Sequence, residues 1–408
     1  MLDRRAMIAG SGALVAAGPL SARVLPQDMV PLIGPGYRPA DVDERGMWQQ
    51  MERVEEEIAG SNLLIRDPVA VRYLHGLIGD VGGPAAKDMR IYLAHIPDFN
   101  AVMFPTGFAV VFSGLLLRMR NEAQLAGVIA HESGHFLRKH QLRAWRDTKR
   151  KSSIFAVLAM GAGVAGGAAG MYTGNLTQLG QFGTILSLLQ YSRAMEAEAD
   201  AIGIRLIAEA GYDPMWMPRT WQQLIAELNL SARFRRKHRE RDFSLFGTHP
   251  SPESRIADLT SSAREVTIAG KAYRDGREPY LAAIAAIRPT LLDDQVKLND
   301  PGASHHVIGQ LALDGWNGLL AFNQGEVWRL RGASGDDARA ADDYARAVLY
   351  PDAPADAWRW HGLMLVKSGR RDEGRAALAR YLAMAPTAPD APFVRQMLDR
   401  GQIPNGKT

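Results

Sequence analysis

The sequence predicts an α+β fold that is predominantly helical and contains one small β-sheet. The helices are predicted by apolar residues at helical spacing around residues 121–140 and 192–214, and by helical patterns beyond Arg264. The sheet is predicted by residues 91–114, which are rich in β-branched and aromatic residues and interrupted by Pro and Gly, so we expect two short strands there. With 408 residues, 47% of them hydrophobic, the chain is long enough for two or three domains.

The composition excludes several classes of function. A formal net charge of +4 without an aromatic and basic pattern does not indicate nucleic-acid binding, so we expect no nucleic-acid partner. The sequence contains no cysteine, which excludes structural disulfides, a lipoprotein anchor and a cysteine protease.

Residues 1–25 read as an export signal. Arg4 and Arg5 precede a mildly apolar stretch, and a plausible cleavage point follows Ala22. The paired arginines are similar to a twin-arginine (Tat) signal, with the Sec pathway as the alternative. We therefore expect an exported protein, either periplasmic or membrane-associated in the cell envelope.

Two elements are expected before the central motif. Residues 43–59 have apolar residues at a helical period and predict a helix that packs on the core. Within residues 91–114, an edge strand could pair with the extended main chain of a substrate. His95 lies there without a partner motif, so we expect an ordinary strand histidine.

The chain is organised around HESGHFLRKH at residues 131–140. The preceding run has apolar residues at helical spacing and begins with Asn121 and Gln124, which are placed like a loose capping box. On one helix His131 and His135 share a face and can bind a single ion, with Glu132 beside them.

A second half of the site is expected in residues 192–214. A helix there places Glu196, Asp200 and Gly203 on one stripe. A catalytic zinc takes three protein ligands and keeps an open position, and Glu196 fits the third place beside two histidines. Asp200, one turn later, could accept a hydrogen bond from the ring N–H of a ligand histidine.

Three ordered motifs, HESGH, EAEAD and THPSPESRI at 248–256, resemble the Ste-type zinc metallopeptidases, the group of the CAAX prenyl proteases, HtpX, the mitochondrial Oma-type proteases and the BepA-type proteases. The resemblance covers about residues 45–260 and implies a zincin-type metallopeptidase domain. It also implies one zinc ion, held by His131, His135 and Glu196, and Glu132 as general base. It places His249 and Arg255 near the substrate carbonyl.

The resemblance implies a zinc metalloendopeptidase of the bacterial cell envelope that acts on misfolded or stalled proteins. Two alternatives stay open: a membrane-embedded protease of the HtpX kind, and a chaperone or scaffold with residual proteolysis. For His249 we expect closure of the metal site at rest, with hydrogen bonding to the oxyanion as the opposing role.

Residues 153–172 carry no charge but are rich in glycine and alanine, which makes them weakly hydrophobic. We expect a helical excursion over the active site, by resemblance to BepA-type members. Membrane association through this segment, by full or partial insertion, is the alternative.

The predicted domains are the signal at 1–25, the metallopeptidase at 26–264, a helical connector at 265–315 and a helical domain at 316–408. Residues 325–354 are echoed by 361–390, which resembles tetratricopeptide repeats. We expect this last domain to bind substrate polypeptides or an envelope assembly partner. A plain helical bundle is the alternative. His305 and His306 are adjacent and point apart on a helix, so we expect structural roles.

Overall fold

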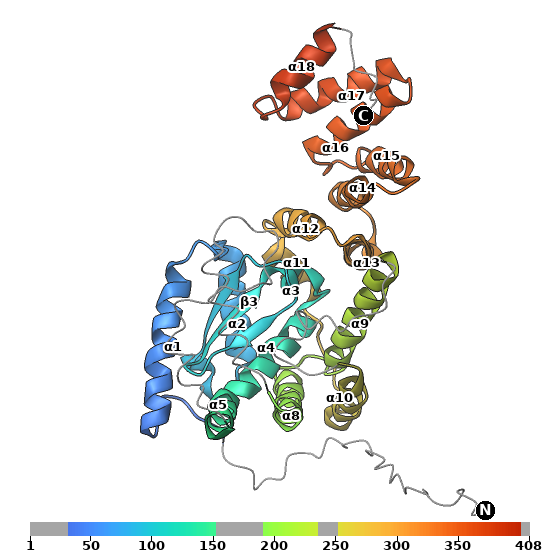
Figure 1. Ribbon diagram of the computed structural model, residues 1–408. Coiled ribbons are helices and arrows are strands. Elements are labelled where there is room, and N and C mark those ends of the chain that lie inside the picture. Colours follow the sequence, from blue (N-terminus) through green and yellow to red (C-terminus); the bar gives the residue numbers. More distant parts are fainter. Residues whose placement is uncertain (1–31, 152–190, 236–251, 401–408) are drawn as a thin grey trace, which may run out of the picture.

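The computed structural model describes residues 32–151, 191–235 and 252–400. A globular body carries an elongated arm of helices, which extends away from the body in Figure 1. The export signal at 1–25, the segment 153–172 and His249 lie outside the described residues. Within the described ranges, no helix combines the length and the apolar character needed to cross a membrane.

The sheet has three strands in the order β1-β3-β2, where β1 is Arg90–Ala94, β2 is Ala101–Met103 and β3 is Phe108–Phe112. β1 runs parallel to β3, and β2 runs antiparallel to it. The expectation of two strands was therefore wrong by one, because the chain leaves the sheet after β1 and returns before Pro105 as a separate short edge strand.

Both faces of the sheet are buried. Side chains at alternate positions of β3 enter different clusters: Ala109 and Val111 belong to the main core, whereas Phe108 and Val110 pack with Met51 of α1 (Val42–Gly60). The helix predicted at 43–59 is thereby confirmed. The main core lies on the opposite face and includes α2 (Pro68–Val81), the 3₁₀ helix Gly83–Asp88 and α4 (Glu122–Leu137).

The start of α4 follows the predicted capping pattern in modified form. Asn121 Oδ1 accepts a hydrogen bond from the Gln124 N–H at 3.0 Å, as an N-cap residue does. The Gln124 side chain accepts in turn from the Arg120 N–H at 2.8 Å, one residue before the position that a capping box would use. The helix that carries the HESGH motif therefore has a firmly capped start.

Further helices complete the body and the arm. The body has α3 (Ser113–Arg118), α5 (His140–Lys151), α8 (Arg193–Glu209), α9 (Trp216–Phe234) and α10 (Pro252–Val266). The connector has α11 (Arg277–Ile284), α12 (Arg288–Lys297), α13 (Pro301–Leu311) and the 3₁₀ turn Ala312–Asp314. The arm has α14 (Gly318–Arg331), α15 (Asp336–Ala347), α16 (Ala355–Lys367), α17 (Arg371–Met384) and α18 (Ala391–Arg400).

The connector is anchored in the main core of the body. Tyr280 is fully buried, and its hydroxyl donates a hydrogen bond to the Leu116 carbonyl of α3. Arg118 donates to both Glu227 of α9 and Gln295 of α12, and these side chains are also buried. Helices beyond residue 264 thus stabilise the body directly. The predicted division at 264 and 315 stays a prediction.

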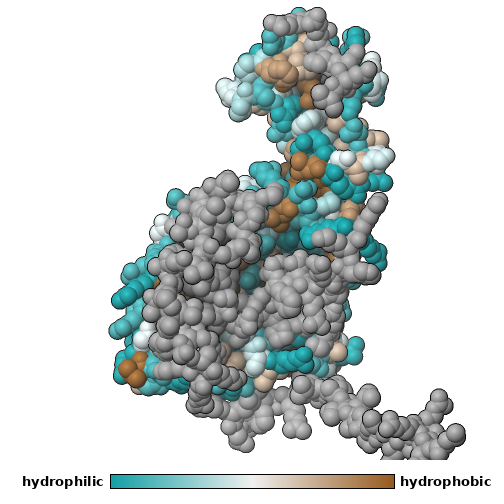
Figure 2. Space-filling model, in the orientation of Figure 1, coloured by the Kyte–Doolittle hydropathy of each residue, from teal (hydrophilic) through white to brown (hydrophobic). Residues whose placement is uncertain are grey.

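The arm contains helix pairs that pack in a repeated way. In the first pair Gly325 faces the Tyr344 ring, and in the second Gly362 faces the Leu378 side chain. The arm shows hydrophobic residues on its surface and at its junction with the body, whereas the visible described surface of the body is mainly hydrophilic (Figure 2). Assignment of these pairs as tetratricopeptide repeats stays a prediction.

Candidate active site

Helix α4 presents two histidines to one buried point. His131 and His135 are four residues apart and therefore lie on the same face of α4. Their Nε2 atoms are 3.1 Å apart, and both side chains are buried. Burial of two imidazoles with their Nε2 atoms this close is typical of a shared ligand.

Helix α8 brings a carboxylate to the same point. Glu196 is buried, and its two oxygens lie 3.6 Å from His131 Nε2 and 3.5 Å from His135 Nε2. The two helices approach closely because glycine lies at both contact points. A Cβ on Gly203 would lie 3.0 Å from the His131 nitrogen, and a Cβ on Gly134 would lie 3.0 Å from Ala199 Cα. Close helix packing therefore places Glu196 against the histidines.

These three side chains fit a metal ion. One ligand atom from each of His131, His135 and Glu196 lies within 4.8 Å of the others. Tetrahedral zinc with bonds of about 2.0 to 2.1 Å places its ligand atoms about 3.3 Å apart, close to the separations of 3.1, 3.5 and 3.6 Å found here. Two imidazoles and a carboxylate are also the donor types that a catalytic zinc takes.

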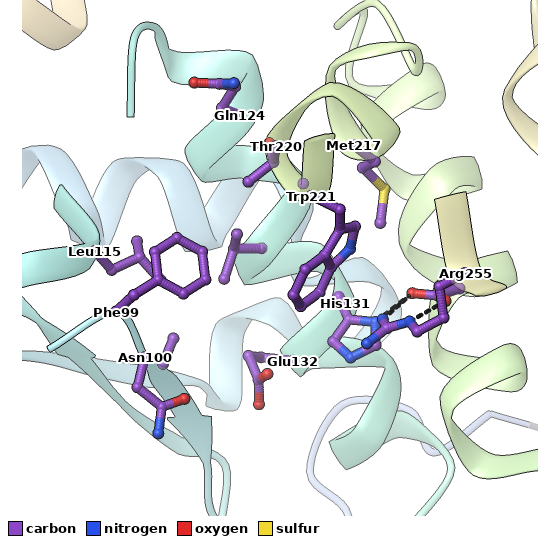
Figure 3. A pocket seen from close by; sticks show the side chains of 14 residues that line it. Phe99, Asn100, Leu115, Gln124, His131, Glu132, Met217, Thr220, Trp221 and Arg255 are labelled. Carbon is purple, nitrogen blue, oxygen red and sulfur yellow. Dashed lines mark hydrogen bonds and ion pairs between the residues drawn. The ribbon is translucent and has the colours of Figure 1, made fainter. Parts of the chain in front are cut away.

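Asp200 and Arg255 connect the ligands to one another. Asp200 Oδ1 lies 2.8 Å from His131 Nδ1, the ring nitrogen that faces away from the cluster. Arg255 of α10 contacts Asp200 through two nitrogens, at 2.6 and 3.0 Å, and contacts Glu196 at 2.9 Å. Burial alone would raise the pKa of Asp200, but the Arg255 guanidinium and His131 hold that pKa far below its usual value. Dashed lines at Arg255 and His131 in Figure 3 mark contacts of this kind.

Glu132 lies between α4 and the edge strand. The N–H of Met103 in β2 donates a hydrogen bond to Glu132 Oε2 at 3.1 Å. The Met103 carbonyl accepts from the Gln141 side chain at 2.8 Å. The carboxylate is thus oriented by the strand that the sequence predicts to bind substrate.

A cavity opens next to Glu132 and His131. It encloses about 560 Å³, a volume that includes open solvent. Phe99 and Leu115 line one side and Met217 and Trp221 the other, while Gln124 and Thr220 lie at the end away from Glu132 (Figure 3). The apolar walls ending at a carboxylate can hold an apolar side chain beside a reacting group.

Sequence reasoning missed two polar residues behind His135. His140 Nδ1 lies 2.9 Å from His135 Nδ1, and His140 Nε2 lies 2.9 Å from Glu198 Oε2. Burial lowers the pKa of His140 to about 4, although Glu198 opposes this effect. Burial raises the pKa of Glu198, but hydrogen bonds from His140, Arg138 and Arg143 outweigh burial and bring it to about 2. The available signals were the third histidine of HESGHFLRKH and the second glutamate of EAEAD.

An aromatic ring covers the same histidine. Tyr191 stacks on the His135 ring, with centroids 3.8 Å apart and an interplanar angle of 20°. Tyr191 is buried, and burial together with the nearby Glu132 and Glu196 raises its pKa well above the usual value, so it stays neutral. The stacking restricts how far the His135 ring can tilt.

Three other histidines, His95, His305 and His306, lie away from the cluster of His131, His135 and Glu196. His95 follows β1 and pairs with Asp294 of α12. His305 contacts Gln324 at 2.9 Å and lies beside the Trp328 ring, and His306 is partly buried next to it on α13. His95 therefore lies just after the strand in which it was expected, and the structural roles of these three histidines stay predictions.

The part of the chain that forms this site is similar to known proteins. Residues 71–263 match the family model described as Peptidase family M48. The beta-barrel assembly-enhancing protease of Escherichia coli is 31% identical over 218 residues, which is 52% of this chain and 42% of that protein. The protein of the same name in Yersinia pestis is 30% identical over 271 residues, or 62% of this chain and 52% of that protein.

A mitochondrial relative matches as well. The mitochondrial metalloendopeptidase OMA1 of Arabidopsis thaliana is 35% identical over 136 residues, which is 33% of this chain and 25% of that protein. The chain therefore spans about half, or less, of the length of the curated relatives it matches.

Proposed function

Since residues 71–263 match the family model described as Peptidase family M48, we propose that the chain is a zinc-dependent metalloendopeptidase of the bacterial cell envelope. Its proposed substrates are misfolded or stalled proteins. The match confirms the resemblance to BepA-type and Oma-type proteases. The observation that carries the proposal is the meeting of His131, His135 and Glu196 next to Glu132 at the end of an apolar cavity.

His131, His135 and Glu196 would hold the zinc ion. Zinc bound there would supply a Lewis acid for the peptide carbonyl. Glu132 would take a proton from the attacking water on its carboxylate and pass it to the leaving amine. Asp200 would orient the His131 ring, and Arg255, which contacts both Asp200 and Glu196, would hold these two carboxylates in place.

The edge strand and the cavity would position the substrate. Met103 already uses both its backbone N–H and its carbonyl for Glu132 and Gln141, so pairing with a peptide main chain would occur near Ala101, which lines the cavity. The cavity would take an apolar side chain of that peptide. Misfolded proteins expose such side chains, which supports them as the substrate class.

A chelator experiment tests this function. We expect purified protein to cleave casein, to lose that activity with a strong chelator, and to regain it with one equivalent of zinc per chain. Cleavage that persists after complete metal removal would contradict the proposal.

His249 and the arm extend the proposal. We propose that His249 restrains the metal site at rest, so His249→Ala should raise casein cleavage. A loss of about 100-fold would instead assign His249 to stabilisation of the oxyanion.

Export through the segment 1–25 and binding of an envelope assembly partner by α14–α18 are likewise proposed. Export would be tested by Arg4→Lys with Arg5→Lys, which should block a twin-arginine signal.

A further inference from the structure

We propose that His140 and Glu198 are positioning residues for the metal, because they fix the tautomer and the orientation of the His135 ring. This inference rests on the proposed function, since it takes His135 as a metal ligand. It assigns a role to the buried His140 and the partly buried Glu198, which do not themselves reach the metal cluster.

The proton positions follow from the donors and acceptors in the chain of contacts. An ionised carboxylate can only accept hydrogen bonds, so His140 Nε2, 2.9 Å from Glu198 Oε2, must carry the proton. A neutral His140 then has a lone pair on Nδ1. His135 Nδ1, 2.9 Å away, must donate its N–H to that lone pair. The other nitrogen of His135, Nε2, is left with its lone pair directed at Glu196 and His131.

Glu198 is held as an acceptor by two cations. Arg138 Nε lies 3.3 Å and Arg143 Nη1 lies 2.9 Å from Glu198 Oε2, the same oxygen that His140 contacts. The Arg138 side chain is 6% exposed, so its charge is largely shielded from water. Both charges favour the ionised carboxylate and therefore the tautomer of His140 that accepts from His135.

The backbone is bent so that these groups can meet. Residues five apart on a continuous α-helix lie about 140° apart around the axis, so the His140 ring could not face His135. Lys139 adopts φ +52°, a conformation rare for a residue with a side chain, and it separates α4 from α5. His140 thereby becomes the first residue of α5. Lys139 thus ends α4 in the left-handed conformation common after a helix, and this turn lets the His140 ring face His135.

The two metal-facing histidines are thus oriented in different ways. His131 faces Asp200 directly, whereas His135 reaches its carboxylate through a second imidazole. Glu198 and Asp200 are both on α8, two residues apart on either side of Ala199, which packs on Gly134. One close helix crossing therefore supplies the metal ligand and both orienting carboxylates.

Substitutions at both positions separate orientation from packing. His140→Leu removes the acceptor and keeps an apolar side chain, whereas His140→Gln keeps an amide oxygen that can accept. We expect His140→Leu to weaken zinc binding by about 10- to 100-fold and His140→Gln to retain affinity within about threefold. Glu198→Met should weaken zinc binding by about tenfold, and Glu198→Gln should recover most of it. Leu292→Ala, a core change in α12, is the control for a loss of stability alone, and it should leave zinc affinity unchanged.

The readouts are zinc affinity by competition with a chromophoric chelator and the ¹⁵N chemical shifts of the His135 ring. In the wild type and His140→Gln we expect a protonated Nδ1, and in His140→Leu a mixture of tautomers. Circular dichroism establishes whether each variant folds. If His140→Leu does not fold, the comparison of Glu198→Met with Glu198→Gln tests the inference. Wild-type affinity in His140→Leu or in Glu198→Met, or equal losses in the Leu and Gln variants, would overturn the inference. If His131→Ala does not weaken zinc binding in the full chain, the proposed function itself fails instead.

Discussion

Replacing Gly203 with alanine tests whether the close crossing of α4 and α8 builds the candidate site. The added Cβ would lie 3.0 Å from the His131 nitrogen, 3.1 Å from His131 Cα and 3.3 Å from the Ala130 carbonyl carbon. All three atoms are backbone, so no side chain can rotate away. Since an ordinary contact begins near 3.4 Å, the helices must separate by about 0.4 Å at this point.

Two opposing contributions decide how Gly203→Ala changes the free energy of unfolding. Overpacking of this kind costs about 1 to 3 kcal/mol, and alanine gains about 1 kcal/mol over glycine inside a helix, so Gly203→Ala should destabilise by about 0 to 2 kcal/mol. Zinc affinity should fall by about tenfold, because Glu196 moves with α8 relative to the two histidines.

Gly79→Ala is the matched control. Gly79 lies on the exposed side of α2, and a Cβ there meets nothing within 4 Å. The free energy of unfolding of Gly79→Ala should rise by about 0.5 to 1 kcal/mol, and its zinc affinity should equal that of the wild type. Urea unfolding of the metal-free proteins and calorimetric zinc titration measure both effects. If Gly203→Ala gains as much stability as Gly79→Ala and keeps wild-type zinc affinity, the reasoning is refuted.

Two further predictions concern stability. Arg118→Met should lower the free energy of unfolding in urea by about 3 kcal/mol, because it leaves the buried Glu227 carboxylate without its charged partner. The double variant with Glu227→Met should recover most of that loss. A double variant no more stable than Arg118→Met would contradict this. His95 pairs with Asp294, and this hydrogen bond raises the pKa of His95 above 6.5, although partial burial opposes it. The pair therefore contributes its full stabilisation of the folded protein below pH 6.5, and this contribution is lost as pH rises through the pKa of His95 in the folded state. His95→Gln should show a smaller drop in Tm between pH 6 and pH 8 than the wild type, and equal drops would argue against the pair.

The helices of the site could be predicted from sequence because their signals are local. The four-residue spacing of His131 and His135 and the stripe formed by Glu196 and Asp200 follow from helix geometry alone. That the two helices meet was expected from the need of zinc for a third ligand and from the family resemblance, but their close packing at Gly134 and Gly203 has no local signal in the sequence. The same limit applied to His140, which reaches His135 only because Lys139 bends the backbone.

The sheet shows how a short segment can mislead. Residues 91–105 read as one β-rich run, yet β1 pairs parallel to β3 and β2 pairs antiparallel to it. Both strands border β3, and the segment between them crosses from one edge of the sheet to the other. Consecutive strands are usually neighbours in a sheet, so the order of the chain did not indicate that β1 and β2 lie on opposite sides of β3.

The central claim assigns binding of the metal to Glu196 and proton transfer to Glu132. Zinc content and casein cleavage of Glu196→Gln and Glu132→Gln, measured on the same folded preparations, test this assignment most directly. Glu196→Gln should lose bound zinc and activity together, whereas Glu132→Gln should keep one zinc per chain and lose turnover by at least about 100-fold. Equal zinc loss in both variants, or full activity in either, would contradict the account.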